Sequence, residues 1–178
     1  CSRAEKTDTN NIFFGGISVG YFIALHLAYM DQLSEFPSYV DTTGQPGLHG
    51  GIEGLSGNAG YSSKVKAIVN MCGAIGDTAW MHSGDIPLVS FHGTNDGTVP
   101  FGSAEIYLVP PSTYPLLQVD GSSSITARAN QVGIENCFDI YYGQDHVPYT
   151  SNAAYYDTTL SITRNFLEHE VCGIPLDC

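Results

Sequence analysis

Ser18 stands at the centre of the pentapeptide Gly16–Gly20 (GISVG), a G-x-S-x-G pattern in which a sharp turn can present a serine hydroxyl as a nucleophile. An apolar stretch ends at Ile17, and a helix-like stretch begins at the last residue of the pentapeptide or at the next one. The turn would therefore join a strand to a helix, and its glycines leave room where side chains would clash. The amide of Val19, at the helix start, could donate a hydrogen bond to a developing oxyanion. A glycine-rich strand–helix turn without catalysis is the alternative.

A serine hydroxyl needs a base to become a nucleophile, and the base needs an acid that orients it. With the nucleophile on such a turn, the chain order is serine, then Asp or Glu, then His. Asp96 follows the apolar run Ile86–His92, and His146 follows the apolar run Cys137–Tyr142. Ligands bind at the carboxyl ends of the strands in open parallel sheets. We therefore predict that Ser18 is the nucleophile, Asp96 the acid and His146 the base.

Other acids and histidines compete for these roles. Asp77 is the rival acid, because it follows another apolar run, Val65–Cys72. Asp145 is interpreted as a turn residue, since the side chains of adjacent residues diverge from one another. His92 is interpreted as a structural residue at a strand end, with a supporting role for the site as the alternative. The other histidines are expected to be packed in a helix (His26) or solvated (His49, His82 and His169).

Short apolar runs predict strands, and the stretches between them predict helices. The expected strands are Asn11–Ile17, Val65–Cys72, Ile86–His92 and Cys137–Tyr142, and the expected helices are Tyr21–Leu33, Ser123–Val132 and Ser151–Glu170. The first helix is apolar almost all round, so we expect it to be buried. Thr150 or Ser151 is the candidate N-cap of the last helix. This alternation predicts an α/β fold with a mostly parallel sheet flanked by helices.

Length and charge narrow the class of protein further. The 178 residues predict a single domain, residues 1–178, with a glycine-rich insertion at 42–60 and a second irregular connection at 109–124. Acidic residues outnumber basic ones 18 to 6, so nucleic acid and anionic membrane surfaces are poor partners. No run reaches the roughly 18 apolar residues of a membrane-spanning helix.

The chain has five cysteines: Cys1, Cys72, Cys137, Cys172 and Cys178. An odd number leaves at least one free thiol or one external partner. The sequence contains no C-x-x-C pair, which would have predicted a metal site. Cys72 is interpreted as a small buried hydrophobic residue. Cys172 and Cys178 are candidates for a disulfide, with each other or with another cysteine. The acidity and the low lysine content fit a secreted or periplasmic protein.

Three motifs together resemble the esterase/lipase branch of the α/β-hydrolase superfamily, and most of all its secreted bacterial carboxylesterases. They are GGISVG followed by ALHLAYMD, the acid loop HGTNDGTVP, and the base loop GQDHVPY. The resemblance covers about residues 8–172. It implies that Ser18, Asp96 and His146 hydrolyse a carboxylic ester, short-chain or sugar-linked, through an acyl-enzyme and without a metal or cofactor. A serine peptidase with the same triad, or a non-catalytic module of this fold, are the alternatives.

The resemblance breaks down at the front of the chain. In the family several strands precede the strand that carries the nucleophile, together with an H-G-G loop that supplies a second oxyanion donor. Here only Cys1–Asn10 precede the first strand, and the only H-G-G stretch is His49–Gly51, in the glycine-rich insertion. The first strand would then have a bare apolar edge, which favours pairing with another chain. We therefore expect a homodimer, or a further N-terminal segment of the gene product that covers this edge.

Overall fold

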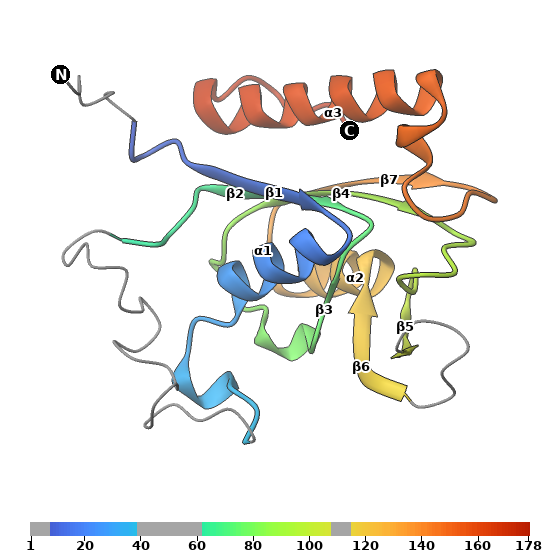
Figure 1. Ribbon diagram of the computed structural model, residues 1–178. Coiled ribbons are helices and arrows are strands. Elements are labelled where there is room, and N and C mark those ends of the chain that lie inside the picture. The colour runs from blue at the N-terminus through green and yellow to red at the C-terminus, as the bar shows by residue number, and fades with distance from the viewer. Residues whose placement is uncertain (1–7, 39–61, 108–114) are drawn as a thin grey trace, which may run out of the picture.

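The computed structural model describes residues 8–38, 62–107 and 115–178, and its centre is a four-stranded parallel sheet (Figure 1). The strand order is β1-β2-β4-β7, and these strands are Phe13–Ile17, Ala67–Met71, Leu88–Gly93 and Asn136–Tyr141. Helices α1 (Val19–Tyr29) and α2 (Ser122–Val132) cover one face of the sheet, and α3 (Ala153–Cys172) covers the other. The predicted α/β fold with a parallel sheet flanked by helices is confirmed.

The central strands are apolar on both faces because both faces are covered. Ile68 and Leu88 pack with residues of α1 and α2 in one buried cluster, whereas Val69 and Val89 pack with Phe166 of α3 in the other. Side chains alternate between the two faces of a strand, so a strand between two helical layers must be apolar at every position. This explains why the runs over β2 and β4 are nearly continuous instead of alternating.

Two features of the helices depart from the sequence expectation, the burial of α1 and the N-cap of α3. α1 is not buried all round, because Ile23 and Leu27 are 61% and 41% exposed on the side that no described element covers. α3 begins after Asn152, whose side-chain oxygen accepts a hydrogen bond from the amide of Ala154 at 2.9 Å. The N-cap is therefore Asn152 and not Thr150 or Ser151, because only its side chain bonds a free amide of the first turn.

A second sheet was not predicted. It is antiparallel, with the order β3-β6-β5 over Ala74–Ile75, Pro115–Gly121 and Ser103–Tyr107. The stretch 109–124 was expected to be irregular because of its prolines, but Pro115 is the first residue of β6, a position where the missing amide hydrogen is tolerated. The predicted glycine-rich insertion at 42–60 lies outside the described residues.

The described cysteines comprise one disulfide and two free thiols. Cys137 in β7 is bonded to Cys178, Cys72 is buried and free, and Cys172 is exposed and free. Cys178 therefore pairs with a cysteine of the sheet and not with its near neighbour Cys172. The interpretation of Cys72 as a small buried residue agrees with its position, whereas Cys1 lies outside the described residues.

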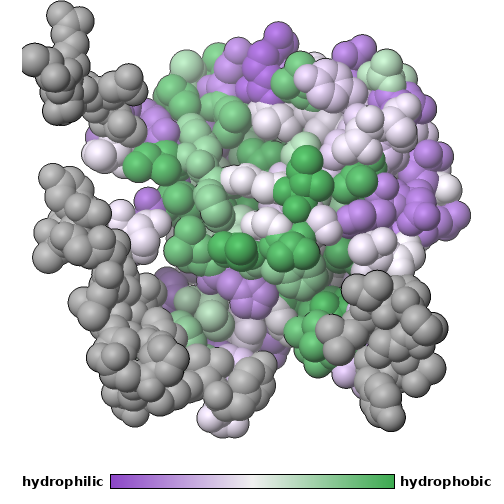
Figure 2. All heavy atoms as spheres, in the orientation of Figure 1, coloured by the Kyte–Doolittle hydropathy of each residue, from purple (hydrophilic) through white to green (hydrophobic). Residues whose placement is uncertain are grey.

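The outer edge of β1 pairs with no strand in the part of the chain that the structure describes. The carbonyl of Ile12 accepts from the amide of Lys66, directly before β2, and the amide of Ser18 donates to Met71 of β2. The backbone groups of Phe13, Gly15 and Ile17 therefore point away from the sheet. Exposed apolar side chains continue from this edge along α1: Ile17, Val19, Ile23 and Leu27. Figure 2 shows apolar side chains gathered on this side of the molecule.

None of the described helices is both long enough and apolar enough to span a bilayer.

Candidate active site

Ser18 occupies the turn between β1 and α1 with φ 56° and ψ −116°, a conformation that costs strain for any residue with a side chain. Its amide donates to the carbonyl of Met71 at 3.3 Å, which ties the turn to the neighbouring strand. A Cβ atom at Gly16 would come within 2.9 Å of the backbone of Gly20, so Gly16 must stay small, whereas a Cβ atom at Gly20 would meet nothing within 4 Å. The structure thus places Ser18 in the strained strand–turn–helix that the sequence predicts.

The amide of Val19 belongs to the first turn of α1, where the amides have no partner within the helix. The positive end of the helix dipole lies at the same place. An oxyanion that forms beside Ser18 would therefore meet a hydrogen-bond donor there. The other candidate for this role, His49–Gly51, lies outside the described residues.

Asp96 and His146 are in contact although 50 residues separate them. Nδ1 of His146 lies 2.6 Å from Oδ2 of Asp96, and the side chain of Asp96 is fully buried whereas that of His146 is 18% exposed. Both residues follow carboxyl ends of adjacent strands, Asp96 after β4 and His146 after β7. The N–H at Nδ1 of His146 donates to this carboxylate, so the lone pair of the other ring nitrogen, Nε2, is available to accept a proton.

The carboxylate of Asp96 accepts three hydrogen bonds and is in contact with a second imidazole, that of His92. Oδ1 accepts from the amides of Thr98 at 2.9 Å and Val99 at 2.8 Å, and Oδ2 faces His146 and His92. Burial alone would raise the pKa of Asp96, but the hydrogen bonds from the two imidazoles and the two amides outweigh it and hold this pKa well below its ordinary value. Asp96 is therefore an anion in the folded protein at neutral pH.

The loop that carries His146 is fastened to the loop that carries Asp96. Oδ1 of Asp145 accepts from the amide of Gly97 at 3.0 Å and from the amide of His146 at 2.7 Å. A Cβ atom at Gly93 would lie only 2.3 Å from the carbonyl oxygen of Gln144, so the two loops touch without space for a methyl group. Asp145 is thus a turn residue, as the sequence analysis interpreted it, and it positions the backbone of His146.

The third contact of a triad is not formed. Within the described residues, the hydroxyl of Ser18 makes no hydrogen bond, so it is not joined to His146 in this structure. The hydrogen bonds of a catalytic site are often long before substrate binds and tighten in the complex. The structure thus brings Asp96 and His146 together, and it places Ser18 at the same carboxyl edge of the sheet.

Cys72 is a residue beside this site that sequence reasoning missed. It directly follows β2, with φ 58°, and is fully buried, and its Sγ lies within 4.8 Å of side-chain oxygen and nitrogen atoms of Asp96 and His146. The hydroxyl of Tyr149 lies 3.8 Å from this sulfur, and burial raises the pKa of the thiol. Its place directly after a strand, like that of Asp96 and His146, was the signal that could have found it.

Thiol, carboxylate and imidazole together are a donor set for a soft divalent cation. However, Oδ1 of Asp96 already accepts two amide hydrogen bonds and Oδ2 faces two imidazoles, so a metal ion would have to displace these partners. A second group with suitable atoms comprises Glu135, His169 and Glu170, where Nε2 of His169 lies 2.8 Å from Oε1 of Glu135. This group lies on the surface near the end of α3.

The rival residues have structural roles. Asp77 caps a short 3-10 helix, Thr78–Trp80, by accepting from the amide of Ala79 at 2.7 Å. Nδ1 of His26 donates to the carbonyl oxygen of Phe22 in its own helix at 2.5 Å, and its ring packs against Trp80. Neither Asp77 nor His26 contacts Asp96 or His146.

No family model matches this sequence. No curated protein matches it either. Solved structures do: the apo form of Thermogutta terrifontis esterase 2 superposes with a TM-score of 0.54 at 18% identity over 89% of this chain and 55% of the esterase. The same esterase phosphorylated by paraoxon superposes with a TM-score of 0.54 at 18% identity, over 89% of this chain and 53% of the esterase. Its propionate-bound form superposes with a TM-score of 0.56 at 16% identity, over 88% of this chain and 54% of the esterase.

This chain is similar in fold to part of that esterase. It spans just over half the length of the esterase chains that it matches, and an identity of 16–18% establishes likeness of fold alone. The α/β-hydrolase-like architecture expected from the three motifs is thus supported by structure. The chemistry of the site must be argued from its own residues.

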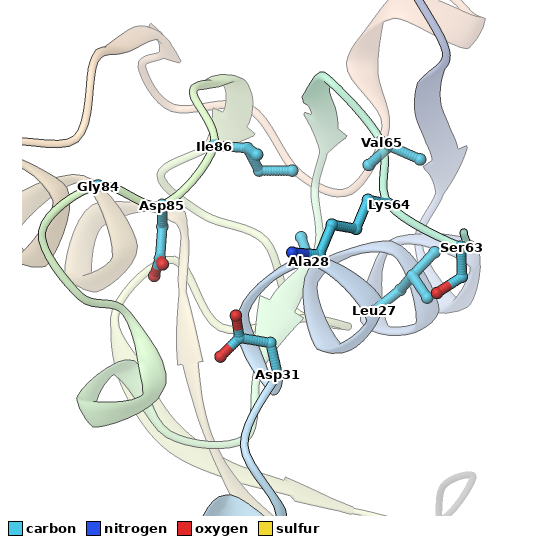
Figure 3. Close-up of a pocket in the computed structure, with 9 residues that line it drawn as sticks. All are labelled: Leu27, Ala28, Asp31, Ser63, Lys64, Val65, Gly84, Asp85 and Ile86. Atoms are coloured by element: carbon cyan, nitrogen blue, oxygen red, sulfur yellow. The ribbon is translucent and has the colours of Figure 1, made fainter. Parts of the chain in front are cut away.

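Two cavities lie away from Asp96 and His146. One, of about 420 Å³, lies at the amino ends of the strands, where Val65 precedes β2 and Ile86 precedes β4. Figure 3 shows Asp31, Asp85 and Lys64 around it. The other, of about 360 Å³ and almost wholly apolar, lies between the ends of β1 and β2 and helix α3. Only the second borders the site, because Ile17 lines it next to Ser18.

Proposed function

We propose that this protein is a serine-dependent hydrolase of carboxylic esters, with Ser18 as nucleophile, His146 as base and Asp96 as acid. The observation that carries the proposal is the Asp96–His146 pair at the same carboxyl edge as a strained serine turn. Strain at a serine between two small residues is typical of a nucleophile that must stand clear of its helix. The esterase fold supports the same reaction class.

The reaction follows from these positions. Nε2 of His146 takes the hydroxyl proton of Ser18 as Oγ attacks the ester carbonyl, and the buried anion of Asp96 stabilises the resulting imidazolium. The amide of Val19 donates to the oxyanion of the tetrahedral intermediate. The imidazolium then protonates the leaving alcohol, and a water molecule, activated by the same base, releases the acid from the acyl-enzyme. None of these steps needs a metal ion or an organic cofactor.

We propose short-chain or sugar-linked esters as substrates. The structures of the similar esterase include propionate-bound and butyrate-bound forms, which are short carboxylates. The motif resemblance and the acidity of the chain favour a secreted or periplasmic site of action. A small-molecule ester, and neither nucleic acid nor a membrane, is the partner that the net charge of −12 suits.

The experiment is hydrolysis of p-nitrophenyl acetate together with labelling by a fluorophosphonate, which reacts with activated serines. We expect Ser18→Ala to lose at least about 10³-fold in rate and all labelling, whereas Ser34→Ala, a change at an exposed serine, keeps both. Activity retained in Ser18→Ala would overturn the proposal. Faster cleavage of an aminoacyl anilide than of the ester would favour a serine peptidase, and absence of both activities and of labelling would favour a non-catalytic module.

A further inference from the structure

His92 is a second imidazole on the carboxylate of Asp96. It lies in β4, its side chain is fully buried, and both ring nitrogens are engaged. Nε2 lies 3.2 Å from Oδ2 of Asp96 and 3.1 Å from the carbonyl oxygen of Val99, and Nδ1 lies 2.7 Å from Oγ of Ser122. The oxygen that accepts from His146 therefore also faces His92.

The surroundings assign the tautomer of His92. The two groups near Nε2, a carboxylate and a carbonyl, can only accept, so Nε2 carries the hydrogen. Nδ1 of the neutral ring is then an acceptor, and Ser122 is its donor. The side-chain amide of Asn70 donates to Oγ of Ser122 at 3.0 Å, which directs the hydroxyl hydrogen of Ser122 toward the ring.

Asn70 itself is fixed from the other side. Its Oδ1 accepts from the amide of Gly73 at 3.1 Å, and its amide nitrogen also donates to Oγ of Ser90 at 3.0 Å. Every donor in this buried chain thus points the same way, from β2 through α2 and β4 toward Asp96. A buried polar chain whose members are all satisfied is rigid, because leaving any member unpaired is costly.

We propose that His92, supported by Ser122 and Asn70, is a positioning residue for Asp96. It holds the carboxylate of Asp96 in the orientation that His146 requires, and it reduces the negative charge that this carboxylate presents to His146. This inference rests on the proposed function. The amides of Thr98 and Val99 fix Oδ1, but among the described residues only His92 and His146 face Oδ2. Without His92, His146 would be the only group left to set the direction of Oδ2.

Removing the hydrogen of His92 Nε2 has two consequences at His146. The carboxylate gains freedom about its pinned Oδ1, so the imidazole is less well placed to receive the proton of Ser18. The carboxylate also presents more of its charge to His146, which favours the protonated imidazole. The first effect lowers kcat, and the second moves the acid limb of the pH–rate profile to higher pH.

The test compares His92→Leu with His92→Gln in the full chain. Leucine cannot donate, whereas the glutamine side chain can place an N–H close to the position of Nε2. We expect His92→Leu to lower kcat for p-nitrophenyl acetate by about tenfold or more with KM changed less than twofold, and to move the acid limb upward. His92→Gln should recover most of kcat and the original limb. Fluorophosphonate titration counts the competent sites, so a misfolded fraction does not enter kcat.

A second pair of variants, with smaller changes, keeps the test informative if His92→Leu does not fold. Ser122→Ala removes the donor to Nδ1 and should shift kcat and the acid limb in the same direction as His92→Leu, by a smaller amount. Ser90→Ala is the matched control, since Ser90 is equally buried and bonds to Asn70 but lies off the chain to Asp96. We expect Ser90→Ala to change both quantities less than Ser122→Ala does, because it leaves the donor to Nδ1 of His92 in place.

One readout does not depend on activity. The proton on Nδ1 of His146, held between the two side chains, is observable by NMR at low field, and we expect it to exchange faster with water in His92→Leu and Ser122→Ala than in the wild type and Ser90→Ala. Wild-type kinetics, pH limb and proton exchange in folded His92→Leu would overturn the role of His92. A wild-type protein without labelling or hydrolysis would instead overturn the proposed function, and proton exchange would still decide the role of His92.

Discussion

Nδ1 of His146 lies 2.6 Å from Oδ2 of Asp96, across the gap between two loops that follow adjacent parallel strands. The pairing is a consequence of topology, because β4 and β7 run in the same direction and bring their carboxyl ends together. It is also a consequence of the loops, since Asp145 bonds the amides of both Gly97 and His146. An imidazole held this way by a buried anion is suited to take a proton.

Replacing the buried anion should impair catalysis more than binding. In Asp96→Asn the side-chain amide can donate to Nδ1 of His146, which places the hydrogen of the imidazole on the wrong nitrogen. We expect kcat for p-nitrophenyl acetate to fall by about 10⁴-fold, with a small change in KM. Asp77→Asn is the control, since Asp77 only caps a short helix, and it should keep its rate. Equal losses in the two variants would contradict the assignment of Asp96.

The same carboxylate should make stability depend on pH in the acid range. The pKa of Asp96 is lowered in the folded protein from its ordinary 3.8, so the folded state favours the anion. This stabilisation is fully present above about pH 4 and is lost as the pH falls through the folded pKa. We therefore expect the Tm of the wild type to fall toward that of Asp96→Asn as the pH is lowered from 5 to 2. A Tm difference that stays constant over this range would contradict the prediction.

Residues with a local signature were predictable from sequence. The G-x-S-x-G turn around Ser18, and the turns after two apolar runs that carry Asp96 and His146, needed only strand ends and chain order. The buried chain through Asn70 and Ser122 was not predictable, because its members lie 52 residues apart and meet only where α2 packs on the sheet. A polar residue within an apolar strand carries no sign of its partner.

Long-range pairings that depend on the third dimension were missed for the same reason. The partner of Cys178 proved to be Cys137, 41 residues earlier, and no spacing rule distinguishes it from Cys172. The antiparallel sheet was hidden for a different reason in each strand: β3 has only two residues, β5 is mostly exposed, and β6 begins at a proline in a proline-rich stretch. The exposure of Ile23 was also hidden, since an apolar stripe indicates burial whether or not a covering element is present.

Gly93 should be essential for the placement of His146. A methyl group there would meet the carbonyl oxygens of Gln144 and Asp145 at 2.3 and 2.5 Å, so the loop that carries His146 must move. We expect Gly93→Ala to lower kcat/KM by about 10²-fold, because a shift of about 1 Å in a catalytic group is enough for this. Gly97→Ala is the matched control, since its methyl group would meet only Asp145 Oδ1 at 3.8 Å. Comparable activity of the two variants would refute the argument.

The disulfide between Cys137 and Cys178 should stabilise the end of the chain against the sheet. It closes a loop of 41 residues, which by the chain-entropy model is worth about 4 kcal/mol in the free energy of unfolding. We expect Cys178→Ser to lower the urea midpoint markedly, and dithiothreitol to do the same to the wild type but not to the variant. Cys172→Ser, at an exposed free thiol, should leave the midpoint in place. A larger loss of the urea midpoint in Cys172→Ser than in Cys178→Ser would contradict the pairing of Cys178 with Cys137.

The free edge of β1 should make this chain, measured alone, a dimer. The outward backbone groups of Phe13, Gly15 and Ile17 and the exposed apolar side chains of α1 form one face that no described residue covers, and such an edge favours pairing with another strand. Light scattering at micromolar concentration should give twice 19.1 kDa. Ile23→Glu, which places a charge on that face, should halve the mass, whereas Val171→Glu on α3 should not, although Val171 is also exposed. A stable monomer of the wild-type chain would contradict the prediction of a homodimer.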